Sequence, residues 1–190
     1  MDFVSELRTM LAKYSYRDNQ EVELSSGERS NVYVNCKRTV FSPKGQAVVG
    51  NIMLDYLRKY DAHVISGPAA GAIPIVCATL QAAWHDRYQL FGSFVRATKG
   101  TDRKPDIQGV FKPNMNTIVV EDVVTDGELM HTSVETLEAA GANIKAVITL
   151  VDRSVGKPSF KSSRYDYIYL FTIDDLKKTR ATLDLTPKKK

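Results

Sequence analysis

Two patterns of apolar and polar positions alternate along this chain. Short apolar runs or strict alternation predict strands at residues 31–37, 62–66, 88–96, 117–124, 144–153 and 165–173. Between several of them, apolar residues recur every three to four positions, which is typical of helices that bury one face. Ser42 and Pro43 match a helix N-cap and a first-turn proline. The helix after them has two apolar rows, Val48/Ile52/Tyr56 and Val49/Met53/Leu57.

Two further helices follow predicted strands. One covers "IVCATLQAAWH", after the loop "GPAAGAIP"; the other places Met130, Val134 and Leu137 on one stripe and ends at Gly141. Strands that alternate with helices predict an α/β fold, a mostly parallel twisted sheet with helices on both faces. Ligands bind such sheets beyond the carboxyl ends of the strands. We therefore expect a site where the loops "SGPAAG", "EDVVTDGE" and "DRS" converge.

Composition and charge narrow the class of protein. The 190 residues are 43% hydrophobic and 25% charged, as expected for one globular domain, residues 1–190. The net charge of +4 includes three units from the last three lysines, and no basic stripe with interleaved aromatics indicates a nucleic-acid partner. No apolar run is long enough for a membrane span, and "MDFVSELRTML" is unlike a signal peptide. With Cys36 and Cys77 interpreted as reduced core residues, these features predict a cytoplasmic protein.

The most informative segment is "TIVVEDVVTDGELM", in which an apolar strand runs into Glu121 and Asp122. A buried strand seldom ends in two acids unless the charges have a partner or a function. The turn at Gly127 leads into a helix N-terminus, whose free N–H groups suit a phosphate. The acids suit sugar hydroxyls, or a Mg²⁺ ion brought by a phosphorylated ligand. The pattern favours a phosphorylated sugar, but spacing alone equally allows an exposed strand end and an ordinary turn.

The segment "IVVEDVVTDGELM" resembles the phosphoribosyl-diphosphate (PRPP) signature of type I phosphoribosyltransferases. Three more segments, "VELSSGERSNVYVNCK", "SGPAAGAIPI" and "LVDRS", resemble those of the orotate phosphoribosyltransferase family in order and spacing. The resemblance covers about residues 3–156. It implies the type I fold, with a small N-terminal hood (1–40), a core (41–175) and a C-terminal helix with a basic tail (176–190).

The resemblance also implies the reaction. Orotate attacks C1 of PRPP, diphosphate leaves and orotidine 5′-monophosphate forms, as in pyrimidine nucleotide biosynthesis. Mg²⁺ would travel with PRPP and take no ligand directly from the protein; the three histidines, His63, His85 and His131, share no metal-ligand spacing. The family's catalytic loop, here residues 97–109, closes over the neighbouring subunit, which implies a homodimer.

Site residues follow from the same resemblance. The PRPP residues would be Arg96, Glu121, Asp122, Val123, Val124, Thr125, Asp126 and Gly127, with Ala70 and Gly71 from the diphosphate loop. The orotate residues would be Ser26, Tyr33, Thr125 and Arg153. The catalytic residues would be Lys99, Arg103 and Asp122.

Two segments depart from the family's pattern. The catalytic loop is one residue shorter, has Ala97 where the family has a lysine, and contains no histidine. In the phosphate loop, Asp126 and Glu128 bring two negative charges to a site for a dianion, and Leu129 lacks the expected hydroxyl. A carboxylate within ~5 Å of a phosphate costs on the order of a few kcal/mol. Two alternatives therefore stay open: a phosphoribosyltransferase for another base, and a catalytically impaired homologue that binds nucleotides or has a regulatory role.

Overall fold

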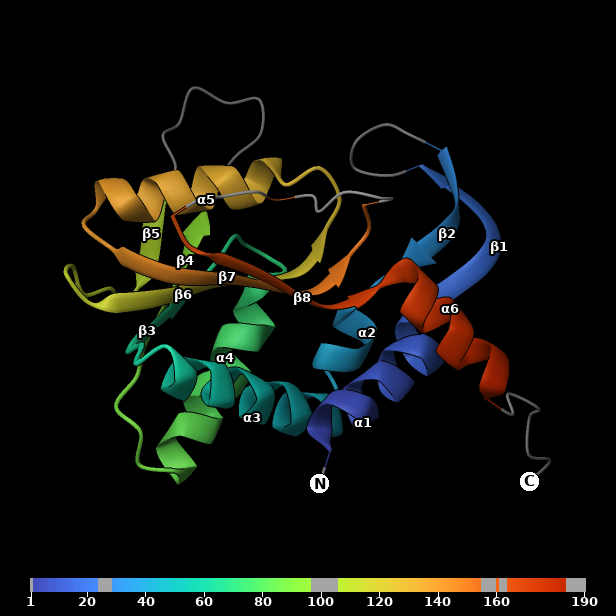
Figure 1. The fold of residues 1–190 in the computed structure, drawn as a ribbon, viewed down its shortest axis with the longest axis horizontal. Helices are drawn as coiled ribbons and strands as arrows, with labels where there is room; N and C mark the ends of the chain where they lie inside the picture. Colours follow the sequence, from blue (N-terminus) through green and yellow to red (C-terminus); the bar gives the residue numbers. More distant parts are fainter. Residues whose placement is uncertain (1, 24–28, 97–105, 155–159, 161–163, 184–190) are drawn as a thin grey trace.

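A six-stranded sheet forms the centre of the computed structural model, which describes residues 2–23, 29–96, 106–154, 160 and 164–183 (Figure 1). The strand order is β5-β4-β3-β6-β7-β8. The strands are β3 (Val64–Ser66), β4 (Phe91–Arg96), β5 (Asp106–Gly109), β6 (Asn116–Val124), β7 (Asn143–Asp152) and β8 (Asp166–Thr172). All neighbouring pairs are parallel except β4 and β5. The mostly parallel sheet is thereby confirmed.

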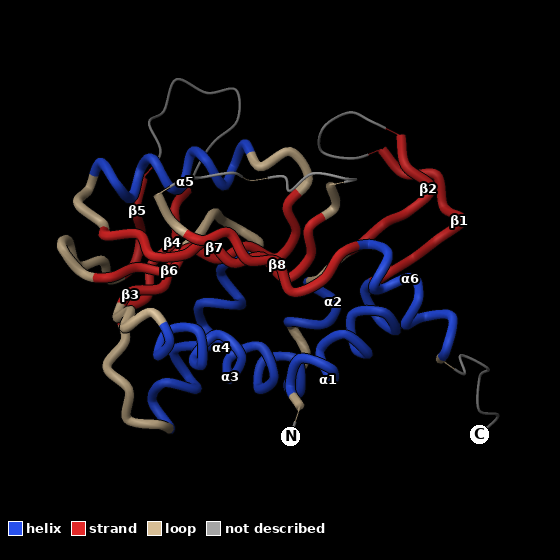
Figure 2. Tube along the Cα trace, in the orientation of Figure 1, coloured by secondary structure: helices blue, strands red, loops and turns tan. Residues whose placement is uncertain are grey.

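Helices cover both faces of this sheet, as the alternating pattern predicts (Figure 2). On one face lies α5 (Glu128–Ala139), and on the other lie α3 (Pro43–Lys59) and α4 (Ala72–His85). The chain begins with α1 (Phe3–Met10) and a π-helical turn, η1 (Leu11–Ser15). It continues after the sheet into α6 (Ile173–Thr182), which packs against α1 and β8.

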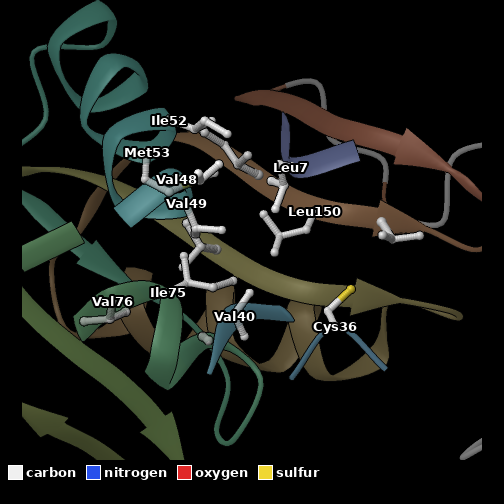
Figure 3. Close-up of a cluster of buried hydrophobic side chains, with 14 of the residues drawn as sticks. Leu7, Cys36, Val40, Val48, Val49, Ile52, Met53, Ile75, Val76 and Leu150 are labelled. Atoms are coloured by element: carbon white, nitrogen blue, oxygen red, sulfur yellow. The ribbon is translucent and has the colours of Figure 1, made fainter. Parts of the chain in front are cut away.

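The larger apolar core lies between the sheet and the α3 side. Figure 3 shows Val48 and Ile52 of α3 gathered with Leu7 of α1 beside Leu150 of β7. Both predicted rows of α3 are buried apart from Tyr56, which packs against the same core. Burial of such side chains contributes about 1.5–3 kcal/mol each, which makes this face the main source of stability.

A second core lies between the sheet and α5. It contains the predicted stripe of α5, Met130, Val134 and Leu137, all at most 1% exposed. Val119 of β6 and Val147 of β7 face this stripe from the sheet. Strand β6 is buried on both faces, and this packing fixes the position of its C-terminal part, which contains Glu121 and Asp122.

The hood is a separate two-stranded antiparallel sheet, β1 (Tyr16–Glu23) with β2 (Arg29–Val34). It projects beyond the carboxyl ends of β6 and β7 (Figure 1). The short helix α2 (Lys37–Val40) leads from the hood back to the core. The hydroxyls of Ser15 and Thr39 share a buried hydrogen bond of 2.7 Å that joins η1 to α2.

The predicted start of α3 is confirmed, but two elements and the position of one cysteine were not predicted correctly. Ser42 Oγ accepts the N–H of Gly45 at 3.0 Å and Pro43 opens the helix, as predicted. Helix α1 and strand β5 were not predicted from the pattern. The interpretation of both cysteines as core residues is wrong for Cys77, because it lies on the outer face of α4 and is exposed, whereas Cys36 is buried. Within the described ranges, no helix is long and apolar enough to cross a membrane.

Candidate active site

The two acids lie inside the protein. Glu121 is 7% exposed and Asp122 is 5% exposed, because β6 continues past them to Val124 and pairs with β7. The alternative interpretation, an exposed strand end, is therefore wrong. Buried carboxylates need compensating partners, and those partners define the site.

Backbone amides and one lysine compensate the acidic pair. The N–H of Asp122 donates to Glu121 Oε1, and the N–H of Val123 donates to Asp122 Oδ1, both at 3.0 Å. Lys37 Nζ lies 2.9 Å from Asp122 Oδ2. Burial, and then the charge of Asp122, raise the pKa of Glu121 well above its ordinary value. The carboxyl of Glu121 therefore resists ionisation in the folded protein.

Lys37 keeps its positive charge in this setting. Burial lowers the pKa of its ammonium, but the charge and hydrogen bond of Asp122 and the charge of Glu121 outweigh burial, so the net effect raises the pKa. The sequence reasoning gave Lys37 no role. The pattern places Lys37 at the end of the predicted strand 31–37, but in the structure β2 ends at Val34 and Lys37 opens α2.

The diphosphate loop, residues 67–71, lies directly against the acids. A Cβ on Gly71 would lie 2.1 Å from Glu121 Oε1 and 2.2 Å from Asp122 Oδ1, so a side chain there would displace them. The loop is held to β4 by hydrogen bonds of 2.8 Å between Ala69 and Val95 and between Val95 and Gly67. Ala70, joined to Ala69 by a cis peptide bond, is exposed. The structure thus brings the predicted loop and the predicted acids together.

The phosphate turn follows β6 and opens α5. Gly127 has a φ of 78°, a left-handed conformation that favours glycine. A cavity of about 150 Å³ lies at the turn, lined in part by Glu121, Thr125, Asp126 and Leu129. The N–H of Glu128 donates to Asp126 Oδ1 at 3.1 Å, so the protein's own carboxylate engages one of the amides that open the helix. Both acidic side chains of the turn are exposed.

Two of the predicted orotate residues lie near each other at the hood. Arg153 Nη2 donates to the carbonyl oxygen of Val32 in β2 at 2.9 Å, which joins the end of β7 to the hood. Burial lowers the pKa of the Arg153 guanidinium, and the neighbouring Tyr33 side chain opposes this effect. Tyr33 is 38% exposed. A guanidinium at this place suits a planar carboxylate.

Arg96 ends β4, next to the diphosphate loop, since Pro68 of that loop forms a bridge with Val95. Ser26, Lys99 and Arg103 lie outside the described residues, as does Ala97. Within the described ranges, no group of three or more His, Cys, Asp or Glu side chains could hold a metal ion. The carboxyl oxygens of Glu121 and Asp122 are of the ligand type that Mg²⁺ prefers, but backbone N–H groups and Lys37 already engage several of them. The pair therefore fits an ion that a phosphorylated ligand holds.

Comparison with known proteins agrees with this geometry. No protein-family model matches the chain. A crystal structure of Mycobacterium tuberculosis orotate phosphoribosyltransferase in complex with PRPP superposes with a TM-score of 0.74 at 25% identity, covering 92% of this chain and 99% of the other. Similarity to such solved structures shows that the fold is that of the type I phosphoribosyltransferases.

Curated relatives give the narrower assignment. An orotate phosphoribosyltransferase from a Nostoc species is 34% identical over 174 residues, 90% of this chain and 84% of the relative. Another, from a Bradyrhizobium species, is 35% identical over 141 residues, 72% of this chain and 76% of the relative. The chain therefore belongs to the orotate phosphoribosyltransferase family.

Proposed function

We propose that this chain transfers the 5-phosphoribosyl group from PRPP to orotate, giving orotidine 5′-monophosphate and diphosphate. The single observation that carries the proposal is the contact between the buried pair Glu121/Asp122 and Gly71. This contact joins acceptors for sugar hydroxyls to a backbone loop for diphosphate. The relatives described above are orotate phosphoribosyltransferases, which supports orotate as the base. A phosphoribosyltransferase for another base is therefore not favoured.

In this proposal, PRPP contacts three neighbouring parts of the site. The ribose diol donates to Glu121 and Asp122. The 5′-phosphate lies at the turn that follows Val123 and Val124, which is formed by Thr125, Asp126 and Gly127. The diphosphate lies over the loop that contains Ala70 and Gly71, with Arg96 beside it. The M. tuberculosis enzyme, which has a similar fold, has been crystallised in complex with PRPP and with inorganic phosphate, which supports PRPP as the ligand.

Orotate lies between the hood and the end of β7. Arg153 binds its carboxylate, Tyr33 and Ser26 cover the ring from the hood, and Thr125 lies between the base and the phosphate turn. The hydrogen bond from Arg153 to Val32 orients the guanidinium toward the hood before orotate arrives. A preoriented arginine lowers the entropic cost of binding.

The chemistry requires positioning and charge stabilisation rather than a covalent nucleophile. N1 of orotate gives up its proton to solvent and forms a bond to C1, while the bond between C1 and the diphosphate oxygen breaks and its electron pair leaves with the diphosphate. Positive charge that develops on the ribose is stabilised by the neighbouring Asp122 carboxylate. Lys99 and Arg103 would stabilise the departing diphosphate from the catalytic loop. Mg²⁺, bound with PRPP, would offset part of the diphosphate charge.

We also propose that the enzyme acts as a homodimer in the cytoplasm, with each catalytic loop serving the partner's site. Phe41 and Trp84, 68% and 79% exposed in the single chain, offer apolar surface for such a contact. Mixing Lys99→Ala with Asp122→Asn subunits tests the shared site. Restored turnover in the mixture supports it, and a mixture as inactive as either parent contradicts it.

The reaction itself is tested by the loss of orotate absorbance after mixing with PRPP and Mg²⁺. We expect turnover in the natural chain, and a fall of at least about 100-fold in Asp122→Asn. Glu135→Gln, which removes an exposed acid of α5, is the matched control and keeps its activity. No turnover, together with no thermal shift from PRPP, would overturn the proposal and favour a nucleotide-binding homologue.

A further inference from the structure

Lys37 stands where the hood, the acidic pair and the core meet. It is the first residue of α2, three residues after the last residue of the hood strand β2, Val34. Its Nζ lies 2.9 Å from Oδ2 of Asp122, 85 residues away in sequence. The Lys37 side chain is 44% exposed, whereas that of Asp122 is 7% exposed. The Lys37 ammonium therefore lies between the buried Asp122 carboxylate and solvent.

The other oxygen of the same carboxylate faces the diphosphate loop. A Cβ on Gly71 would lie 2.2 Å from Asp122 Oδ1. One carboxyl group thus has the lysine on one oxygen and the loop on the other. The loop itself reads Gly-Pro-Ala-Ala-Gly and carries no charged side chain, so it offers only backbone dipoles to a ligand with several negative charges.

Substrate binding changes the balance of charge around Asp122. Ribose hydroxyls that donate to Asp122 compete with the ammonium for the same oxygen atoms. At the same time a diphosphate over the loop, which lies against the other oxygen of the same carboxylate, presents a far larger negative charge than Asp122 does. A lysine ammonium on a flexible, half-exposed stem can turn between two such partners, because its three donors rotate freely.

We propose that Lys37 exchanges partners during the reaction, from Asp122 in the free protein to the diphosphate of bound PRPP. The exchange frees Asp122 for the ribose diol and supplies a cation to the leaving group. Lys37 itself transfers no proton: the C1–O electron pair leaves on the diphosphate oxygen, and Lys37 stabilises that charge by hydrogen bonding. The inference rests on the proposed function and makes Lys37 a catalytic residue of it.

The test compares two partial ligands. Inorganic diphosphate with Mg²⁺ probes the leaving-group side, and ribose 5-phosphate probes the diol side; both affinities are measured by calorimetry. In Lys37→Met we expect diphosphate binding to weaken by about 10- to 100-fold, as for loss of a charge-assisted hydrogen bond. Ribose 5-phosphate keeps or gains affinity, because its hydroxyls no longer compete with the ammonium for Asp122. Lys37→Arg restores much of the diphosphate binding. Lys44→Met, which removes a lysine paired with Glu6 away from the site, binds both ligands as the natural chain does.

Each outcome decides between a catalytic and a structural role. Equal weakening of both ligands in Lys37→Met would show that the lysine only holds Asp122 in place, and would overturn the exchange. Unchanged diphosphate affinity would overturn it as well, while turnover of orotate by the natural chain would leave the proposed function standing. If the natural chain neither turns over orotate nor binds diphosphate, the function and the exchange fail together.

Discussion

The carboxylate of Asp126 accepts the backbone N–H of Glu128, with 3.1 Å between Oδ1 and the nitrogen, at the start of α5. This is an amide that a 5′-phosphate would use in a helix N-terminal site. The protein thus supplies an internal anion at the place where we propose that the ligand's anion binds. PRPP has to displace Asp126 or bind beside it, and either event costs affinity.

Neutralising Asp126 tests this competition. Asp126→Asn keeps a side-chain oxygen that can accept the N–H of Glu128 but removes the charge, so PRPP should bind at least about 10-fold more tightly. Calorimetry with PRPP and Mg²⁺ measures the change. Glu135→Gln, an equal change of charge on the exposed face of the same helix, should leave the affinity unaltered.

A double change, Asp126→Thr with Glu128→Gly, removes both negative charges of the turn and should tighten PRPP binding further. Unchanged affinity in both variants would mean that the two carboxylates already lie outside the field of the bound phosphate.

Arg153→Ala should raise the KM for orotate by about 100-fold, because a bidentate guanidinium–carboxylate pair is lost. The KM for PRPP should change far less, since Arg153 is assigned to the base. Arg153→Lys restores the charge without the planar pair of donors and should recover only part of the loss. Steady-state kinetics with each substrate varied in turn gives both constants, and equal effects on the two would contradict the assignment.

Gly71→Ala should remove activity without straining the backbone. Gly71 has a φ of −67°, which alanine adopts readily, but the added Cβ would push against Glu121 Oε1 and Asp122 Oδ1. Displaced acids should lower kcat/KM by about 100-fold. Activity equal to that of the natural chain would show that the acids can move aside at no cost to catalysis.

Gly141→Ala is the matched contrast. Its φ of 92° disfavours alanine, so the free energy of unfolding should fall by about 1–2 kcal/mol. Gly141 follows α5 and lies against Pro113, away from the acids, so kcat should stay unchanged. Denaturant unfolding and turnover, measured on both glycine variants, separate damage to the fold from damage to the site.

Glu121 should make stability depend on pH with a definite sign. Burial raises the pKa of Glu121 above 4.5, so the folded protein holds a proton that the unfolded chain releases as the pH rises past that value. The free energy of unfolding therefore falls with rising pH in this window. In Glu121→Gln this contribution to the fall is absent, so the variant gains stability relative to the natural chain as the pH increases.

Urea unfolding of both proteins at a series of pH values above 4.5 measures that difference. Glu135→Gln again serves as the control, because its exposed side chain should give a curve parallel to that of the natural chain. Parallel curves for Glu121→Gln would show that burial of Glu121 has no energetic cost at neutral pH.

Local patterns predicted most of the sheet and the helices that flank it. The alternation of strands and helices, the cap at Ser42 and the stripe of α5 are all read from neighbouring residues. Strand β5 was missed because it is an exposed edge strand that pairs only with β4, and its polar sequence reads as a loop. Cys77 was misplaced because the apolar sequence of α4 does not reveal which of its faces lacks a neighbour.

The sequence by itself determined the fold class and the identities of the acids, the glycine turn and the hood motif, because periodicity and motif spacing are properties of nearby residues. Only the tertiary structure decided that Glu121 and Asp122 are buried, that Gly71 lies against both, and that Lys37 neutralises Asp122 across 85 residues. Contacts between residues so far apart in the chain depend on how the hood, α2 and the sheet pack together, which no local pattern encodes.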